Sequence, residues 1–231
     1  MTEPRRNSSA APLRWVKPPQ QARSKRTLER VLDGAEDVIR ERGVANLTVS
    51  EVVRRAGSSV GAFYARFEDK EGLLATLHER TCSEALATAE LALDPSRWES
   101  ADIASVIGEV IRFVASQCEA RLGLVLAFVS LAASDVSYAR RRAALDKKMG
   151  ALLGTLLLER VDEIAHADPM LAADVTVRMV LGTLESDAVA RRSSSTEPAQ
   201  TDEVLTAELS RAVLAFLGAP VSGGRRTPVS R

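Results

Sequence analysis

The sequence predicts an all-α protein of about nine helices, on three observations. Apolar residues make up 45% of the chain and aromatic residues only 4%, which favours packed amphipathic helices over a β-sandwich rich in Tyr, Phe, Trp and Thr. Apolar residues recur three and four positions apart along most of the chain, the spacing of one face of a helix. No segment shows a clear alternation of apolar and polar residues, so we expect no strand.

The N-terminal part begins with an arm and a first helix. Residues 1–22 contain four prolines together with arginines and serines, a composition that predicts a flexible basic arm. The first helix then follows from apolar residues at helical spacing. These are Leu28, Val31, Leu32, Ala35, Val38 and Ile39.

Three further helices are predicted close together after it. The segment Thr48–Glu51 has the pattern of a capping box, in which a hydroxyl and a carboxylate each bind a backbone N–H at a helix start. This helix continues to about Ala56, and Gly57 then provides a tight turn. A short helix at Ser59–Arg66 follows, and Asp69 caps a longer helix that runs from Lys70 toward Leu91.

The remainder of the chain continues as helices after a loop at Pro95 and Trp98. The charge-free stretch from Leu122 is too short for a membrane span, which needs about 20 residues, so we expect a buried core helix and no membrane partner. The expected helices are Ile103–Val114, Leu122–Ala133, Tyr138–Ala165, Pro169–Arg192 and Asp202–Leu217, and a flexible tail is expected at 218–231.

Charge and cysteine content narrow the function class. Residues 1–80 carry 15 basic and 11 acidic side chains, a net charge of +4, against 16 and 20 in the remainder, a net of −4. A basic head suits nucleic-acid binding, although a solvated basic tail would give the same imbalance. The two cysteines, Cys82 and Cys118, form no CxxC or Cys/His cluster, so we expect no metal site and a reducing, cytoplasmic setting. A redox-sensing pair is the alternative.

The segment Leu47–Leu74 is the most informative one. Two helices joined by a short glycine turn predict a helix-turn-helix, whose second helix can lie in the major groove of DNA. The second helix begins with the small residues 59–62, so its backbone can approach a duplex closely. Tyr64 offers a hydroxyl to a phosphate, and Phe63 and Phe67 are expected to face inward. The alternative is an ordinary helical hairpin whose small residues simply pack.

Residues 23–80 resemble the DNA-binding domain of TetR-type regulators. After an N-terminal helix that opens near Ser24, the residues that carry the resemblance are Thr48, Val52, Val53, Ala56, Gly57, Ser59, Gly61, Phe63, Tyr64, Phe67, Asp69-Lys70-Glu71 and Leu73-Leu74. The resemblance implies a three-helix DNA-binding domain at 23–69 and a helical ligand-binding and dimerisation domain at 70–217. It implies a repressor that a small-molecule effector releases from a palindromic operator.

The resemblance also assigns roles to single residues. It implies phosphate contacts by Thr48, Tyr64 and Lys70, with Lys70 close to the N–H groups of a helix start. Ser59, Gly61 and Ala62 would lie against base edges or thymine methyl groups. The arm residues Arg23, Lys25 and Arg26 either add phosphate or minor-groove contacts or form a solvated tail. Two positions depart from the family pattern: Ser58 stands where valine is frequent, and Val60 where many members have a polar or basic residue. Fewer polar side chains therefore reach base edges.

The second domain is expected to bind the effector and a second copy of the chain. The resemblance implies a homodimer built from the last two long helices, Asp168–Arg192 and Asp202–Leu217. Trp98, Phe113, Phe128 and Met149 are candidates for a ligand pocket, although ordinary core packing would explain each of them. No phosphate-binding loop, nucleophile elbow or zinc-protease motif is present in the sequence, so we expect no enzyme, no catalytic residue and no cofactor. An enzyme, and a ligand sensor that no longer binds DNA, are the competing hypotheses.

Overall fold

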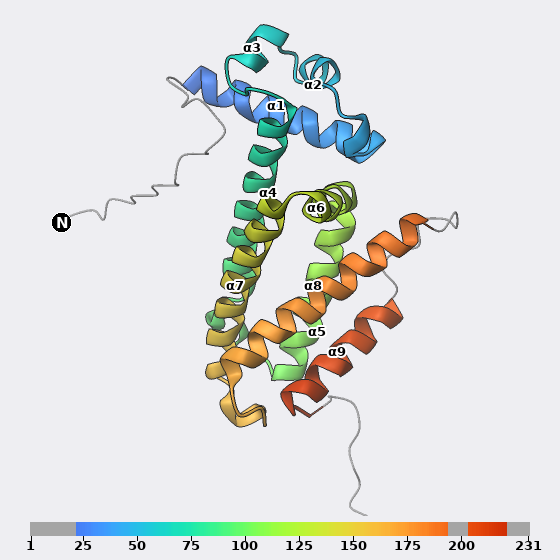
Figure 1. The fold of residues 1–231 in the computed structure, drawn as a ribbon. Helices are drawn as coiled ribbons and strands as arrows, with labels where there is room; N and C mark the ends of the chain where they lie inside the picture. The colour runs from blue at the N-terminus through green and yellow to red at the C-terminus, as the bar shows by residue number, and fades with distance from the viewer. Residues whose placement is uncertain (1–21, 194–202, 221–231) are drawn as a thin grey trace, which may run out of the picture. The chain divides into compact units, whose positions relative to one another are not determined.

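The structure is a computed structural model that describes residues 22–193 and 203–220. Within these ranges the chain forms nine α-helices, three short 3-10 helices and no strand. Figure 1 labels the helices. The predicted all-α class and the number of helices are confirmed. The expected arm at 1–22 (apart from Ala22), the loop at 194–202 and the tail beyond residue 220 lie outside the described residues.

The contacts divide the chain into two compact units after Thr81. The first turns of α4 (Lys70–Ala92) belong to the first unit, to which Leu73, Leu74 and Leu77 contribute buried side chains. The rest of α4 belongs to the second unit. The functional boundary at residues 69 and 70 rests on the family resemblance alone and stays a prediction.

The first unit is a small helical head. Its elements are α1 (Ala22–Arg42), the 3-10 turn η1 (Val44–Asn46), α2 (Val49–Arg55), α3 (Val60–Tyr64) and the start of α4. The whole predicted apolar stripe of α1, from Leu28 to Ile39, is buried. The predicted third helix is shorter than expected, because after Tyr64 the N–H groups of Arg66 and Phe67 both donate to the carbonyl of Phe63 and close a turn.

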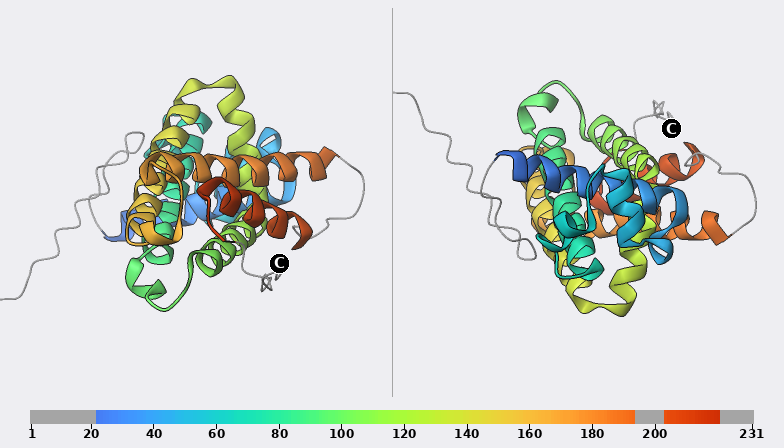
Figure 2. Two further views of the ribbon diagram at one scale, coloured as in Figure 1. Left: turned by 90° about the horizontal axis from the view of Figure 1, so that it is seen from below. Right: turned by 90° about the horizontal axis from the view of Figure 1, so that it is seen from above.

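The second unit is a bundle of longer helices. After the 3-10 turn η2 (Pro95–Trp98), its elements are α5 (Ile103–Ala120), α6 (Leu122–Ser134), α7 (Val136–Leu158), the 3-10 turn η3 (Val161–Glu163), α8 (Pro169–Ser193) and α9 (Glu203–Leu217). α7 packs mainly against α8, and α5 packs mainly against α9, which can be followed in the two further views of Figure 2. Their inward faces form one apolar core.

The helix predicted over Tyr138–Ala165 is wrong at both ends. It begins at Val136, because the carboxylate of Asp135 accepts a hydrogen bond from the backbone N–H of Ser137 at 2.7 Å and caps the helix. It ends at Leu158, well before Ala165. Arg160 is only 8% exposed, and its guanidinium donates to the carbonyls of Trp98 and Ala101. A short turn, η3, follows in place of further helix.

The apolar helix α6 is less covered than expected. Only Leu124, Ala127 and Phe128 of this helix are buried, so the expectation of a fully buried core helix is met only in part. Across the described ranges no single helix is long and apolar enough to cross a membrane. α5 and α6 together have that length, but they meet at a bend of 85°.

Candidate nucleic-acid interface

The start of α2 is fixed by Thr48. Its backbone is extended, and its hydroxyl accepts a hydrogen bond from the backbone N–H of Glu51 at 3.3 Å. The carboxylate of Glu51, which the capping-box pattern assigns to the helix start, instead accepts from the guanidinium of Arg54 at 2.6 Å and that of Arg55 at 3.3 Å. The hydrogen bond from Arg54 lowers the pKa of Glu51 to about 2.

Gly57 makes the turn between α2 and α3, as predicted. Its φ is +54°, a left-handed conformation that costs other residues about 1–2 kcal/mol. The N–H of Ser58 donates to the carbonyl of Val53 at 2.9 Å and closes the turn. Ser59 then caps α3, because its hydroxyl accepts from the N–H of Ala62 at 3.1 Å.

The two faces of α3 differ sharply in burial. Phe63 and Phe67 point inward, with 0% and 1% of their surface exposed, and their ring centroids lie 5.1 Å apart. Ser59, Val60, Gly61 and Tyr64 are exposed, and Ala62 is half-buried. The predicted inward position of the two phenylalanines is confirmed. The inner face anchors the helix and leaves its small-residue face open.

Gly61 lies on this open face without a packing reason inside the protein. A Cβ built at this position would meet no atom within 4 Å, and the backbone lies outside the positive-φ region. Glycine within a helix costs about 0.5–1 kcal/mol relative to alanine. The fold would therefore accept a larger residue at position 61. The exposed backbone of Gly61 leaves space for a binding partner to approach closely.

Of the three predicted contact residues that carry a hydroxyl, Thr48 and Ser59 are held in place by hydrogen bonds of the fold. The oxygens of Thr48 and Ser59 each accept from a backbone N–H at a helix start. A hydroxyl has one donor and two acceptor positions, so each O–H can still donate to an acceptor such as a phosphate oxygen. Tyr64 is 52% exposed, and its ring lies edge-on to that of Phe63 at a centroid distance of 5.2 Å.

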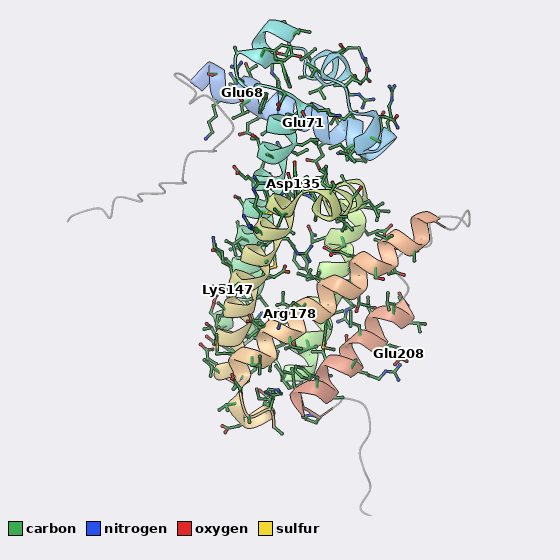
Figure 3. The ribbon with its side chains drawn as sticks, in the orientation of Figure 1. Glu68, Glu71, Asp135, Lys147, Arg178 and Glu208 are labelled. Carbon is green, nitrogen blue, oxygen red and sulfur yellow. The ribbon has the colours of Figure 1, made fainter. Side chains whose placement is uncertain are left out.

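Lys70 lies at the start of α4, as predicted, but acidic residues surround it in sequence. The carboxylate of Asp69 accepts from the N–H of Gly72 at 2.8 Å, which confirms the predicted cap. Figure 3 shows Glu68 and Glu71 on either side of the helix start. Because Asp69 already binds a backbone N–H there, a phosphate contact at this place would depend on the ammonium group of Lys70.

The arm residues fall partly outside the described residues. The side chain of Arg23 lies outside them, whereas Lys25 and Arg26 are exposed on the first turns of α1. The sequence analysis missed Arg66, which donates to Ser24 at 3.1 Å and to the carbonyl of Ala62 at 2.9 Å. Arg66 thereby links the start of α1 to α3 by hydrogen bonds. No local pattern predicts this bond, because its partners are 42 residues apart.

A second missed residue is Arg80, which joins α4 to α1. Its guanidinium lies 2.6 Å from Asp33, 3.0 Å from Glu36 and 3.5 Å from Glu29. These three carboxylates recur at helical spacing along one side of α1, and that spacing is a signal that could have indicated a basic partner.

The structure places the four predicted pocket residues on four different elements, η2, α5, α6 and α7. Trp98 donates from its indole N–H to the carbonyl of Ala92 at 2.8 Å, and Met149 packs at the edge of the second unit's core. Phe113 is 38% exposed. Phe128 stacks on Tyr138 at a centroid distance of 6.3 Å.

An open hollow of about 450 Å³ exists elsewhere in the second unit and is lined by other residues. They are Pro95, Ser96, Glu99, Ala101, Glu159, Arg160 and Glu163. Within the described ranges no group of three or more His, Cys, Asp or Glu side chains could hold a metal ion.

Comparisons with known proteins agree with this geometry. Residues 31–77 match the model of the tetR family of bacterial regulatory proteins. The HTH-type transcriptional regulator YvdT of Bacillus subtilis is 33% identical over 58 residues, which are 25% of this chain and 30% of that relative. The chain therefore aligns with less than a third of the length of this curated relative.

Solved structures extend the similarity to both units. A protein from Mesorhizobium loti, described as a TetR-family transcriptional regulator, has a TM-score of 0.70 at 21% identity, over 85% of this chain and 98% of its own. The regulator FadR of Bacillus subtilis, solved with stearoyl-CoA, has a TM-score of 0.60 at 23% identity, over 85% and 99% of the two chains. At these identities the similarity shows the fold.

Proposed function

Because its N-terminal domain belongs to the TetR family of bacterial regulatory proteins, we propose that this chain is a DNA-binding transcriptional regulator. We further propose that it is a repressor that a small molecule releases from its operator. The observation that supports this most strongly is the open outer face of α3, held outward by the buried Phe63 and Phe67. This arrangement suits a recognition helix that lies in a major groove.

In the proposed complex, phosphate contacts position the protein and contacts to base edges specify the sequence. Thr48, Tyr64 and Lys70 bind phosphates, and the first two carry an exposed hydroxyl. Ser59, Gly61 and Ala62 lie against base edges. Lys25 and Arg26 add positive charge for phosphate contacts from the start of α1. Arg66 links this part of α1 to α3 through its hydrogen bond to Ser24.

We propose that two copies of the chain bind one palindromic operator, with the two heads about 34–36 Å apart so that they reach successive major grooves. The proposed contact uses α8 and α9. One side of α8 presents Leu171, Arg178, Gly182 and Val189 as exposed residues, and Figure 3 shows Arg178 on this helix. A Cβ at Gly182 would meet no atom within 4 Å, so a second helix could approach closely there.

α9 adds a polar pair to the proposed dimer contact. Glu208 and Arg211 are paired within the helix and are 58% and 57% exposed. In a two-fold interface each residue meets the same surface of the other copy. Glu208 of one copy can therefore pair with Arg211 of the other, and Val204 supplies an exposed apolar contact on the same side of the helix.

We propose that the effector binds in the second unit and that the regulator acts in the cytoplasm, where bacterial DNA lies. α6 supports an effector site, because it contains no charged residue and yet only three of its residues are buried. The FadR structure contains stearoyl-CoA, an example of a small molecule on a similar fold. An effector releases DNA only if it binds the DNA-free conformation more tightly.

An electrophoretic shift with duplexes from the neighbourhood of the protein's own gene tests the proposal. We expect specific binding that weakens steeply between about 50 mM and 200 mM salt, because phosphate contacts release counterions. Lys70→Glu should weaken binding. Lys147→Glu, at an exposed position on α7 of the second unit (Figure 3), is the matched control and should not.

Two results would contradict the proposal. If the protein binds none of these duplexes specifically, the proposal that it is a DNA-binding regulator is refuted. Equal binding by the wild type and Lys70→Glu would remove the proposed phosphate contact. A helical ligand sensor that no longer binds DNA would give the first result.

A further inference from the structure

We propose that Val60 is a specificity-determining residue that packs against the 5-methyl group of a thymine in each operator half-site. This inference rests on the proposed DNA-binding function and deepens it by naming one chemical group on the DNA. Val60 is the first residue of α3, and 46% of its surface is exposed.

The exposure of Val60 is unusual within its own unit. Among the described residues of the first unit, Val60 and Tyr64 are the two large apolar side chains that remain exposed. They lie one helical turn apart on the outer face of α3, on either side of Gly61. Single exposed apolar residues are common on protein surfaces. Here both exposed large apolar side chains among the described residues of the first unit fall on the face that is proposed to meet DNA.

The three arginines within six residues of Val60 in sequence are engaged inside the protein, and Arg55 donates to the carboxylates of Glu41 and Glu51. Arg54 donates through Nε and Nη2 to the carboxylate of Glu51 at 3.0 and 2.6 Å. Arg66 donates through Nη1 to the carbonyl of Ala62 and through Nη2 to Ser24. A guanine is usually read by an arginine that donates two hydrogen bonds to its edge. All three candidates for that role already donate at least two hydrogen bonds inside the protein.

Among residues 59–62, Val60 is the one with an apolar side chain larger than a methyl group. Gly61 has no side chain, and the Ser59 hydroxyl accepts from the N–H of Ala62 but can still donate to a base edge. In the major groove, thymine presents an O4 acceptor and a 5-methyl group, and apolar side chains recognise the methyl group by contact. The isopropyl group of Val60 matches this group in chemistry, so the half-site should contain a thymine opposite α3.

The size of the effect follows from the burial of one methyl group. Removing one buried methyl group weakens the affinity about 4-fold. Removing it from both half-sites weakens the affinity about 16-fold, if the two contacts are equivalent. Replacement of thymine by uracil removes only the 5-methyl group and keeps the base pairing. Uracil substitution therefore isolates the proposed contact.

The experiment begins with a duplex selected from a randomised pool by the wild-type protein. Each thymine of this duplex is then replaced by uracil, one symmetric pair of positions at a time, and the affinity is measured for wild type and Val60→Ala. We expect one position per half-site at which uracil weakens the wild type about 16-fold in total. Val60→Ala should bind the thymine and uracil duplexes almost equally at that position.

The matched control is Val136→Ala. Val136 is also an exposed valine at the first residue of a helix, with 61% of its surface exposed, but it lies in the second unit. Its substitution should leave the sensitivity to uracil unchanged. Because both valines are exposed, neither variant should lower the thermal midpoint.

Three outcomes separate the possibilities. Loss of the uracil effect in Val60→Ala alone supports the inference. An equal uracil effect in wild type and Val60→Ala, or no uracil effect at any position, overturns the inference while DNA binding itself stands. A pool in which no duplex is enriched overturns the proposed function and this inference together.

Discussion

Gly61→Ala should change folding stability and DNA affinity in opposite directions. The glycine has no atom within 4 Å of a built Cβ and does not need a positive φ. Alanine in its place should raise the free energy of unfolding by about 0.5 kcal/mol, the lower end of the helix-propensity difference. We take the lower end because Gly61 is the second residue of a five-residue helix. For a chain of this length that corresponds to about 1–2 °C in thermal midpoint.

The same methyl group should obstruct the proposed contact with DNA. It would project from the outer face of α3, where the backbone is expected to approach base edges closely. Forcing an extra methyl group into a packed contact costs about 1–3 kcal/mol, which corresponds to roughly a 5- to 150-fold loss of affinity. Urea denaturation and fluorescence anisotropy with a selected duplex measure the two effects separately.

Gly57→Ala is the matched control for this pair of measurements. A Cβ at Gly57 also has no atom within 4 Å, but its φ of +54° disfavours alanine, so this variant should lose about 1–2 kcal/mol of stability. Two results would refute the reasoning. Gly61→Ala could be less stable than wild type, which would show that the fold itself requires the glycine. Gly61→Ala could also be more stable than wild type and bind DNA with equal affinity. That result would show that the duplex does not lie against Gly61.

Three further predictions concern other charged or reactive groups. Arg80→Met should lower the free energy of unfolding by about 1 kcal/mol, because a network of three carboxylates on α1, two of them largely exposed, loses its shared guanidinium; urea denaturation would contradict this if the midpoint did not move. The pKa of Glu51 is lowered from 4.5 to about 2 by the hydrogen bond from Arg54, so its stabilising effect should be complete above its unfolded pKa and vanish as the pH falls toward about 2. The difference in urea midpoint between wild type and Glu51→Gln should therefore shrink across that range, and a difference independent of pH would rule this out. Burial raises the pKa of Cys118 to about 11, so in a Cys82→Ser variant alkylation at neutral pH should be slow until urea unfolds the protein; rapid alkylation of the folded variant would instead favour a redox-sensing thiol.

Local sequence patterns predicted much of the fold correctly. The apolar stripe of α1, the cap at Thr48 and the glycine turn at Gly57 depend on residues a few positions apart, and the structure contains all three. Patterns that depend on distant partners were not predicted. α7 ends at Leu158, and the Arg160 side chain that follows binds the carbonyl of Trp98, 62 residues earlier.

The candidate site was predictable to a similar extent. The residues of α3 followed from the glycine turn and the family resemblance, and their inward and outward faces followed from helical spacing. The hydrogen bond from Arg66 to Ser24 depends on the packing of α1 against a later element, which no periodicity reveals. The helical spacing of Glu29, Asp33 and Glu36 indicates a basic partner but does not identify it as Arg80. The pocket residues were chosen by residue type and stay a prediction; of them, Phe113 is exposed, whereas Phe128 is buried and stacks on Tyr138.

Protection of Tyr64 by DNA tests most directly whether the outer face of α3 binds a duplex. The chain has two tyrosines, of which Tyr64 is 52% exposed and Tyr138 only 5%, so nitration of the native protein should modify mainly Tyr64. A selected operator duplex should protect Tyr64 and leave Tyr138 unchanged. If Tyr64 is nitrated equally fast in a fully formed complex, the duplex binds elsewhere and α3 is not the recognition helix.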